Sequence, residues 1–302
     1  MEYYANFPAG TGVRPDVWAR EKEAAGWHGI CASDHFWVGG TRYPHVFVAA
    51  TQMACATSRI RITTSFCNNL FRSPVEFAQA ALSLQAASDG RFEAGLGAGW
   101  SRDEIDAMGA EYPDGPTRVS KYVEALKIVA QLLRTGQCEF AGAHYRVNVT
   151  GANRLADVTD RPPALIASAG GPRALREVTP LVERVEIKAS ARATRGGQLD
   201  LAIMPSVTED EVRDQVGRVR AVDPDIPIGI FILTAVGDDP ATRQLQSVIA
   251  RGYLSRFMGE PGPVAEALGG LGALGIDRVQ LTELVPGSHD RLAPHLFATH
   301  GE

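Results

Sequence analysis

The chain has 302 residues, of which 45% are hydrophobic and 22% are charged, and its formal net charge at pH 7 is −5. These values are typical of soluble globular proteins and exclude disordered and fibrous classes. Acidic and basic residues are interspersed along the chain, so we expect a small-molecule ligand and no nucleic-acid partner.

The cysteines and the N-terminal sequence bear on the cellular compartment. Cys31, Cys55, Cys67 and Cys138 form no C-x-x-C pair, so we expect four reduced thiols and a cytoplasmic location. The first residues lack the basic segment of a signal peptide, and no apolar run approaches the roughly 18 residues of a membrane span. We therefore expect no membrane partner.

Short apolar runs recur along the chain and predict eight strands. These runs are residues 3–7, 29–33, 60–66, 92–96, 164–167, 185–188, 226–236 and 279–284. The segments between them have helical spacing, and several carry recognisable start signals.

The clearest helix start is at residues 73–76, where a serine offers an N-cap hydroxyl, a proline occupies the first helical position and a glutamate follows. Residues 208–211 form a second capping box, and Asp239-Pro240 and Pro261 start two further helices. An apolar stripe over residues 119–133 predicts another long helix.

Eight strands, each followed by a helix, predict an α/β fold of the (β/α)8 TIM-barrel type instead of a doubly wound sheet. We expect residues 1–302 to form a single domain. The long interval between the fourth and fifth strands predicts an insertion at about residues 136–163, with a hairpin at 140–147. A glycine- and arginine-rich stretch at 192–197 predicts a mobile loop after the sixth strand.

In such barrels the catalytic groups lie where strands end and helices begin. His35 follows the second strand, and an imidazole suits proton transfer or a hydrogen bond to a developing anion. Asp34 beside it either orients His35 or holds a neighbouring loop; the alternative is that the pair only caps the loop. No histidine or cysteine spacing indicates a metal site.

Two glycine-rich segments follow strands four and five. Residues 95–99 lack the third glycine of a dinucleotide fingerprint, so their glycines either let a flat ligand approach the backbone or only permit tight packing. In Gly170-Gly171-Pro172-Arg173, free N–H groups at a helix N-terminus and a nearby arginine predict a phosphate cradle. The alternative is a glycine turn with a solvated arginine.

Acidic and aromatic residues also mark the strand ends. Asp103, Glu104 and Asp106 are interpreted mainly as first-turn acids that complement a helix dipole. No nucleophile elbow, Walker lysine or kinase motif is present, which disfavours acyl and phosphoryl transfer.

Aromatic residues near three strand ends suit a planar ligand. They are Phe36, Trp37, Phe66 and Trp100.

These stretches resemble the luciferase-like flavin and deazaflavin oxidoreductases, particularly the actinobacterial branch that uses coenzyme F420. The resemblance runs over nearly the whole chain. It rests on residues 33–36, 69–74, 90–100, 140–145 and 170–175, in that order.

The resemblance implies an F420-dependent oxidoreductase that transfers a hydride between the deazaflavin and a small organic substrate. It places His35 as the catalytic group near the pyrimidine side of the ring, Asp34 as the residue that holds the loop, and the cofactor phosphate on the helix at Pro172. It also implies a non-prolyl cis peptide at Ser65-Phe66 and a homodimer. The implied cofactor-binding residues are Ser65, Phe66, Asn69, Gly97, Ala98, Gly99, Trp100, Ser168, Gly170, Gly171, Pro172 and Arg173.

Two alternatives stay open. One is an FMN-dependent monooxygenase of the same fold, in which reduced flavin reacts with oxygen. The other is a non-catalytic barrel that binds a flavin. The Asp34-His35 pair favours the deazaflavin by resemblance, and Trp100 stands where the sugar-phosphate dehydrogenase branch has an acid, which disfavours that activity.

Overall fold

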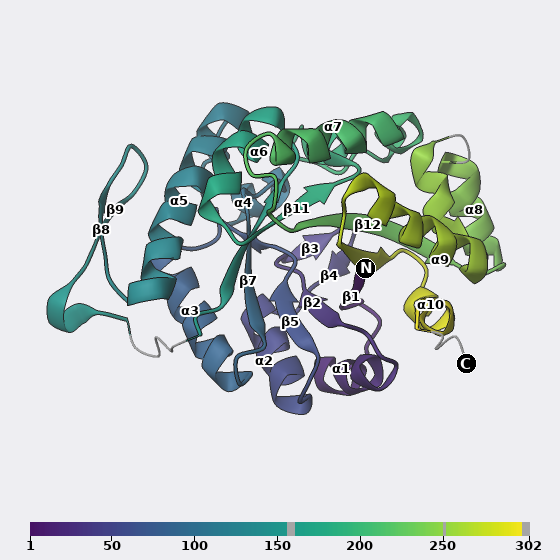
Figure 1. The fold of residues 1–302 in the computed structure, drawn as a ribbon, viewed down its shortest axis with the longest axis horizontal. Helices are drawn as coiled ribbons and strands as arrows, with labels where there is room; N and C mark the ends of the chain where they lie inside the picture. The colour runs from purple at the N-terminus through teal and green to yellow at the C-terminus, as the bar shows by residue number, and fades with distance from the viewer. Residues whose placement is uncertain (156–160, 250–251, 298–302) are drawn as a thin grey trace.

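Eight parallel strands form a closed barrel in the computed structural model, which describes residues 1–155, 161–249 and 252–297 (Figure 1). Around the barrel the order is β1, β2, β5, β7, β10, β11, β12 and β14, which pairs again with β1. The eight predicted strands and the TIM-barrel class are thus confirmed. The barrel strands are β1 (Glu2–Asn6), β2 (Gly29–Ala32), β5 (Arg61–Thr64), β7 (Phe92–Gly97), β10 (Ala164–Ala169), β11 (Arg184–Lys188), β12 (Ile228–Val236) and β14 (Arg278–Glu283).

Helices surround the barrel, and several begin where the sequence predicts. The Ser73 hydroxyl accepts a hydrogen bond from the Glu76 N–H at 3.1 Å, and the Thr208 hydroxyl accepts one from the Glu211 N–H at 3.3 Å. Both predicted N-caps are therefore confirmed. The helices are α1 (Pro15–Ala24), α2 (Val46–Ala56), α3 (Pro74–Ala87), α4 (Arg102–Ala107), α5 (Gly115–Thr135), α6 (Pro172–Val178), α7 (Glu209–Arg220), α8 (Pro240–Ile249), α9 (Pro261–Gly270) and α10 (Ser288–Leu296).

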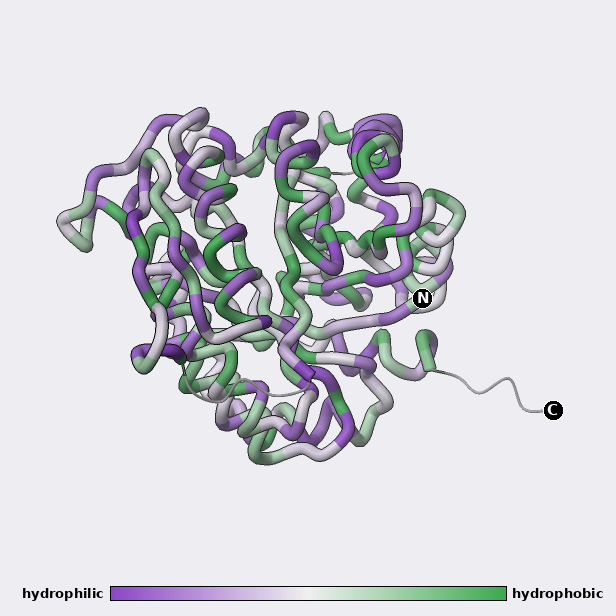
Figure 2. Tube along the Cα trace, turned by 60° about the vertical axis from the view of Figure 1, so that its left-hand side comes forward, coloured by the Kyte–Doolittle hydropathy of each residue, from purple (hydrophilic) through white to green (hydrophobic). Residues whose placement is uncertain are grey.

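The apolar core lies between the strands and the helices. Ile62, Leu165 and Ile230 point outward from the barrel into this layer, where they pack with helix residues such as Phe77 and Leu126. Along the surrounding helices, hydrophobic and hydrophilic residues alternate within a few positions, which is the pattern of helices with one buried face (Figure 2). Among the described residues no helix has the length and apolarity needed to cross a membrane.

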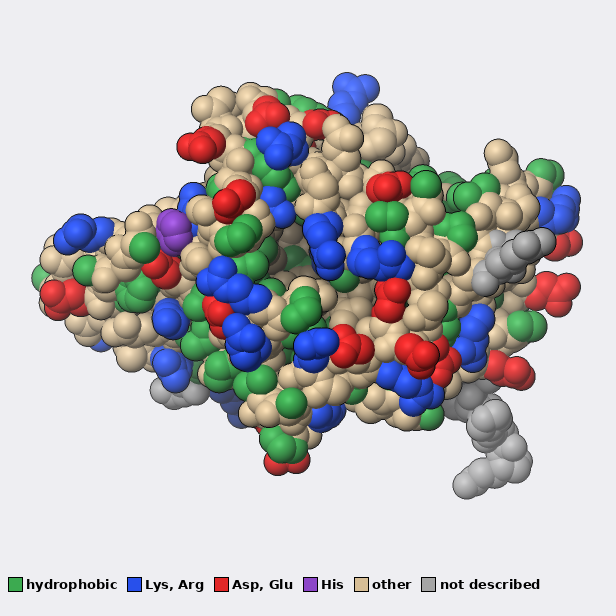
Figure 3. Space-filling model, turned by 90° about the horizontal axis from the view of Figure 1, so that it is seen from above, with side chains coloured by type: hydrophobic (Ala, Val, Ile, Leu, Met, Phe, Trp, Pro, Cys, Tyr) green, Lys and Arg blue, Asp and Glu red, His purple; other side chains and the backbone are tan. Residues whose placement is uncertain are grey.

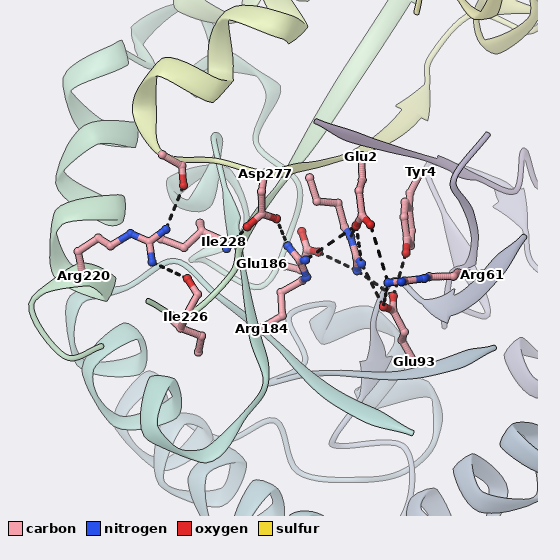
Figure 4. Close-up of polar contacts among 12 residues, drawn as sticks. Glu2, Tyr4, Arg61, Glu93, Arg184, Glu186, Arg220, Ile226, Ile228 and Asp277 are labelled. Atoms are coloured by element: carbon pink, nitrogen blue, oxygen red, sulfur yellow. Dashed lines mark hydrogen bonds and ion pairs between the residues drawn. The ribbon is translucent and has the colours of Figure 1, made fainter. Parts of the chain in front are cut away.

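The lower interior of the barrel is filled by charged residues (Figure 4). The buried guanidinium of Arg278 donates to Glu93 at 2.8 and 3.0 Å and to Glu2 at 2.8 and 2.9 Å, and it lies 4.0 Å from the ring centroid of Tyr4. The carboxylate of Glu186 lies 3.7 Å from the same guanidinium. This network fills the amino-terminal end of the barrel, so we expect a ligand to bind at the carboxyl end of the strands.

The predicted hairpin between the fourth and fifth barrel strands is formed by β8 (Cys138–Ala141) and β9 (Arg146–Val149), and it projects from the body of the molecule (Figure 1). Of the expected insertion at about 136–163, residues 156–160 lie outside the described residues. Four further short strands lie near the ends of the barrel strands. They are β3 (Trp37–Val38), which pairs with β4 (Thr41–Arg42), β6 (Cys67–Asn68) and β13 (Met258–Gly259).

The stretch expected to be a mobile loop, residues 192–197, begins in a short 3-10 helix, Ala191–Thr194, that is anchored to its surroundings. The guanidinium of Arg192 donates to the Glu211 carboxylate at 2.8 Å and to the Ser206 carbonyl at 3.1 Å. An ion pair to α7 and a hydrogen bond to the Ser206 carbonyl therefore hold the start of this stretch.

Candidate functional site

An imidazole and a buried carboxylate meet at the carboxyl end of β2. His35 Nδ1 lies 2.7 Å from Glu104 Oε2, and the Glu104 side chain is fully buried. The other carboxylate oxygen accepts hydrogen bonds from the Phe36 N–H and, at 3.3 Å, from the Trp37 N–H. Glu104 therefore fixes both the His35 ring and the base of the β3–β4 hairpin.

The charge state of Glu104 determines which nitrogen of the His35 imidazole carries a hydrogen. Burial alone would raise the pKa of Glu104, but the hydrogen bonds from His35 and from the Phe36 N–H outweigh it, so the pKa lies below its usual value. An ionised carboxylate only accepts, so Nδ1 carries a hydrogen. Among the described residues His35 Nε2 has no hydrogen-bond partner, which leaves this atom to a ligand.

The acids after strand four differ in their surroundings. Asp103 and Glu104 lie in the first turn of α4, as expected, but Glu104 is buried against His35, whereas Asp103 and Asp106 are exposed. The carboxylate that contacts His35 is therefore Glu104 and not Asp34. The reason is that α4 starts at Arg102, directly after the barrel rim, so the side chain of its third residue turns toward the strand ends.

Asp34 holds the segment that follows β5. Its carboxylate accepts hydrogen bonds from the Asn68 N–H at 2.7 Å and from Arg72 Nη2 at 3.0 Å. Asp34 is buried, with 6% of its surface exposed. Of the two roles expected for Asp34, this geometry matches the one that holds a neighbouring loop.

Aromatic rings surround His35. The ring centroids of Tyr43 and Trp100 lie 5.5 and 5.4 Å from that of His35, both edge-on. Phe36 stacks on Phe71 with centroids 4.6 Å apart and ring planes 6° apart. Of the four predicted aromatic residues, Trp100 therefore lies beside the imidazole, whereas Phe36 packs on Phe71.

The ends of β5 and β10 carry buried hydroxyls without partners. Ser65 precedes a cis peptide bond to Phe66, as the resemblance implies. Ser65 Oγ and Ser168 Oγ are buried, and among the described residues neither has a hydrogen-bond partner. Because buried polar groups are nearly always hydrogen-bonded, these hydroxyls fit a site whose remaining partner is a ligand.

The glycines at the end of strand four leave room for the neighbouring segment of the chain, which packs closely against them. A Cβ on Gly95 would lie 2.0 Å from the Thr64 carbonyl oxygen. Gly99 has a φ of +81°, and a Cβ there would lie 2.3 Å from Asn68 Oδ1. The tight-packing alternative therefore accounts for these two glycines, because a side chain at either position would displace the segment that follows β5.

The other predicted residues of this rim pack together. The Asn69 N–H donates to the Gly97 carbonyl at 3.0 Å, and Asn69 Nδ2 donates to Tyr145 Oη of the β8–β9 hairpin at 3.3 Å. Ala98 is half-buried between Gly97 and Gly99. The insertion therefore reaches the rim through Tyr145, a contact that the sequence did not indicate.

A cavity of about 410 Å³ lies where α6 begins. Gln215 lies in its wall, and among the described residues its buried Oε1 has no hydrogen-bond partner. Seen from above, the surface is hollowed, and basic, acidic and hydrophobic side chains lie around the hollow (Figure 3). The cavity is lined by Gly170, Pro172, Ala191, Arg192, Arg195, Asp210, Glu211, Asp214, Gln215 and Arg218.

Arg173, the arginine expected in the phosphate cradle, lies elsewhere. Its guanidinium donates to Glu177 at 2.9 Å, to the Pro116 carbonyl at 3.1 Å and to the Ser120 hydroxyl at 2.9 Å. A residue near a helix start contacts the residue four positions later, so Arg173 turns along α6 and against α5. The arginines that line the cavity are Arg192, Arg195 and Arg218.

Several residues of this site were missed in the sequence. Glu104 was visible only as one of three acids after strand four, and nothing in the spacing distinguishes the one that turns inward. Arg192 and Arg195 were visible as a basic stretch after strand six, but nothing indicated that they line a cavity together with the acids Asp210, Glu211 and Asp214. Gln215 carries no sequence signal, because it lies on an ordinary amphipathic helix.

Comparison with known proteins gives matches over most of the chain. A family model described as luciferase-like monooxygenase matches residues 17–284. An F420-dependent glucose-6-phosphate dehydrogenase from Amycolatopsis mediterranei (strain U-32) is 29% identical over 159 residues, which cover 51% of this chain and 47% of that protein. The chain thus spans about half the length of the curated relatives it matches.

Solved structures share the architecture over nearly the full length. An F420-dependent secondary alcohol dehydrogenase in complex with an F420-acetone adduct has a TM-score of 0.75 at 18% identity, with 98% of this chain and 97% of that chain covered. A monooxygenase from Streptomyces bottropensis has a TM-score of 0.76 at 17% identity, with 100% of both chains covered. At these sequence identities the structural similarity shows that the proteins share a fold, and nothing about their activities.

Proposed function

The chain belongs to the luciferase-like monooxygenase family, and from this premise we propose that it is a coenzyme F420-dependent oxidoreductase that acts on a small organic substrate. The observation that carries the proposal is the His35–Glu104 pair, which fixes one imidazole nitrogen and leaves Nε2 at the strand ends. The names of the curated relatives and of the alcohol dehydrogenase neighbour support the choice of cofactor.

The residues present fit such a cofactor. The hydroxyls of Ser65 and Ser168 would pair with its ring system, since both are buried without partners among the described residues. The N–H groups of Gly170 and Gly171, with Pro172 opening α6, would hold its phosphate, and Arg192 and Arg195 would replace Arg173 as the nearby cations. When bound, the deazaflavin supplies or accepts the hydride.

The protein side chains supply the proton chemistry. His35 Nε2 donates a proton to the substrate during reduction, or accepts one during oxidation, because Nδ1 is occupied by Glu104. Asp34 and Arg72 fix the segment after β5 on which the ring would rest. Trp100 and Tyr43 cover the imidazole and limit access of water to it.

A fluorescence titration tests the cofactor assignment. We expect the purified protein to quench deazaflavin fluorescence at low micromolar cofactor and to leave FMN unbound at the same concentration. Binding of FMN without binding of the deazaflavin would overturn the proposal and favour the monooxygenase that uses oxygen.

We also propose that residues 1–302 act as one TIM-barrel domain and that two copies form a homodimer. The dimer is proposed from the resemblance to the luciferase-like oxidoreductases, which implies a homodimer. Light scattering that gives the mass of a single chain at micromolar concentration would contradict the dimer.

We also propose a cytoplasmic location, which the free thiols of all four cysteines support.

A further inference from the structure

The last residue of β11 places an amine at the open end of the barrel. Side chains alternate along a strand, so Lys188 points to the same side as Arg184 and Glu186. Those two residues belong to the charged network of the barrel interior (Figure 4). Lys188 lies above them at the carboxyl end of the strand and is half-buried, so its side chain lies at the mouth where a ligand enters.

The ammonium of Lys188 has no counter-ion in the part of the chain that the structure describes. Among the described residues its Nζ forms no hydrogen bond or ion pair, whereas its carbonyl accepts one from Gln215 Nε2 at 3.1 Å. The acid below it, Glu186, lies beside Arg278, and burial raises the pKa of Glu186 to about 7. Burial likewise lowers the pKa of Lys188 to about 8.

Neutral side chains point into the barrel on other strands. Ser168 on β10 is in register with Glu186, and Asn6 on β1 donates a hydrogen bond to the Thr282 hydroxyl. These side chains give Lys188 no counter-charge. Because Lys188 is half-buried and has no counter-ion among the described residues, its ammonium is available to an anionic group of a bound molecule.

We propose that Lys188 binds an anionic group of the substrate, a carboxylate or a phosphate. The substrate of the enzyme is then an organic acid or a phosphate ester. This inference rests on the proposed function for the reaction, but the anion-binding step needs no cofactor and can be tested without one.

Because the chain contains few lysines, the titration of Lys188 can be followed by NMR spectroscopy. The chain has 26 arginines and only four lysines, Lys22, Lys121, Lys127 and Lys188. Lysine labelled with ¹³C at the ε-carbon therefore gives four resonances, and Lys188→Arg identifies the one of interest. The exposed Lys127 serves as the internal control.

We expect inorganic phosphate or acetate, added separately to the cofactor-free protein, to raise the titration midpoint of Lys188 by about one pH unit or more. The midpoint of Lys127 should stay unchanged. If Lys188 shifts no more than Lys127 at saturating anion, the proposal is overturned. A failed deazaflavin titration with a shifted Lys188 would instead overturn the proposed cofactor alone.

A charge-removing variant distinguishes the substrate from the cofactor as the source of the anion. We expect Lys188→Met to weaken phosphate binding by about tenfold or more, Lys188→Arg to restore it, and Lys127→Met to change nothing. Deazaflavin affinity should be the same in all four proteins. If Lys188→Met weakened deazaflavin binding by the same factor, the anion would belong to the cofactor and the substrate class would be overturned.

Discussion

A single buried acid determines what His35 can do. Glu104 accepts from Nδ1 and from two backbone N–H groups, so it sets the ring orientation and the position of the residues after it at the same time. A neutral amide at position 104 would keep the backbone contacts through its oxygen but would lose the charge. The contribution of the charge can therefore be separated from that of the fold.

We expect Glu104→Gln to lower the turnover number by about 10- to 100-fold, because His35 loses the group that fixes its tautomer. Deazaflavin affinity should stay close to that of the unmodified protein. Steady-state kinetics and fluorescence quenching measure the two quantities. Asp103→Asn, an exposed change on the same helix, is the matched control, and equal losses in both variants would contradict the role of Glu104.

Glu186 predicts how stability depends on pH. Its pKa is about 7 in the folded protein and near 4.5 when unfolded, so between these values the folded state binds more protons. The contribution of Glu186 to the free energy of unfolding therefore decreases as pH rises from about 4.5 to 7. Above that range the carboxyl is ionised in both states, and the contribution decreases no further.

We expect Glu186→Gln to increase the free energy of unfolding by up to about 3 kcal/mol near pH 8 and to change it little near pH 5. Urea denaturation at both pH values gives the difference. Glu111→Gln, at an exposed position, serves as the control. A difference of the same size at both pH values would show that Glu186 is ionised throughout.

At the scale of elements, the β8–β9 hairpin is attached to α5 by one carboxylate. Glu124 accepts hydrogen bonds from the N–H groups of Ala143, His144 and Tyr145 at 2.8, 2.9 and 3.1 Å. Tyr145 then reaches Asn69 at the rim of the barrel. The hairpin is thereby part of the wall of the site as well as an insertion.

Removal of this anchor should free the hairpin turn and leave the barrel intact. We expect Glu124→Ala to accelerate hydrogen exchange at residues 143–145 by about tenfold or more. Mass spectrometry of peptides that span the turn measures the rate, with Glu139→Ala on exposed β8 as the control. Unchanged protection in Glu124→Ala would show that other contacts hold the turn.

Elements with strong local signals were predictable, and short ones were not. The N-caps at Ser73 and Thr208 combine a hydroxyl with an apolar period, and both helices begin there. The β3–β4 hairpin was missed although Gly39-Gly40, with φ of 55° and 83°, is a typical two-residue turn. Its strands have two residues each, too few to show alternation.

At the scale of the whole molecule, the barrel separates a polar interior from an apolar layer beneath the helices. The repeated strand and helix signals therefore predicted the architecture, since the outward-facing residues carry the periodic pattern. The site was predictable only in part. His35 and the strand-five glycines follow strands directly, whereas Glu104, Gln215 and Lys188 acquire their roles from the closure of the barrel, which brings distant segments together.

We infer that this barrel uses a deazaflavin for hydride transfer, with His35 as the proton-exchanging group. The most direct measurement is anaerobic turnover, in which reduced or oxidised coenzyme F420 is mixed with a panel of organic acids and phosphate esters and its visible absorbance is followed. We predict turnover without oxygen, reduced by about 100-fold or more in His35→Asn, with unchanged cofactor binding. Turnover that requires reduced FMN and oxygen, or that is unaffected in His35→Asn, would contradict the account.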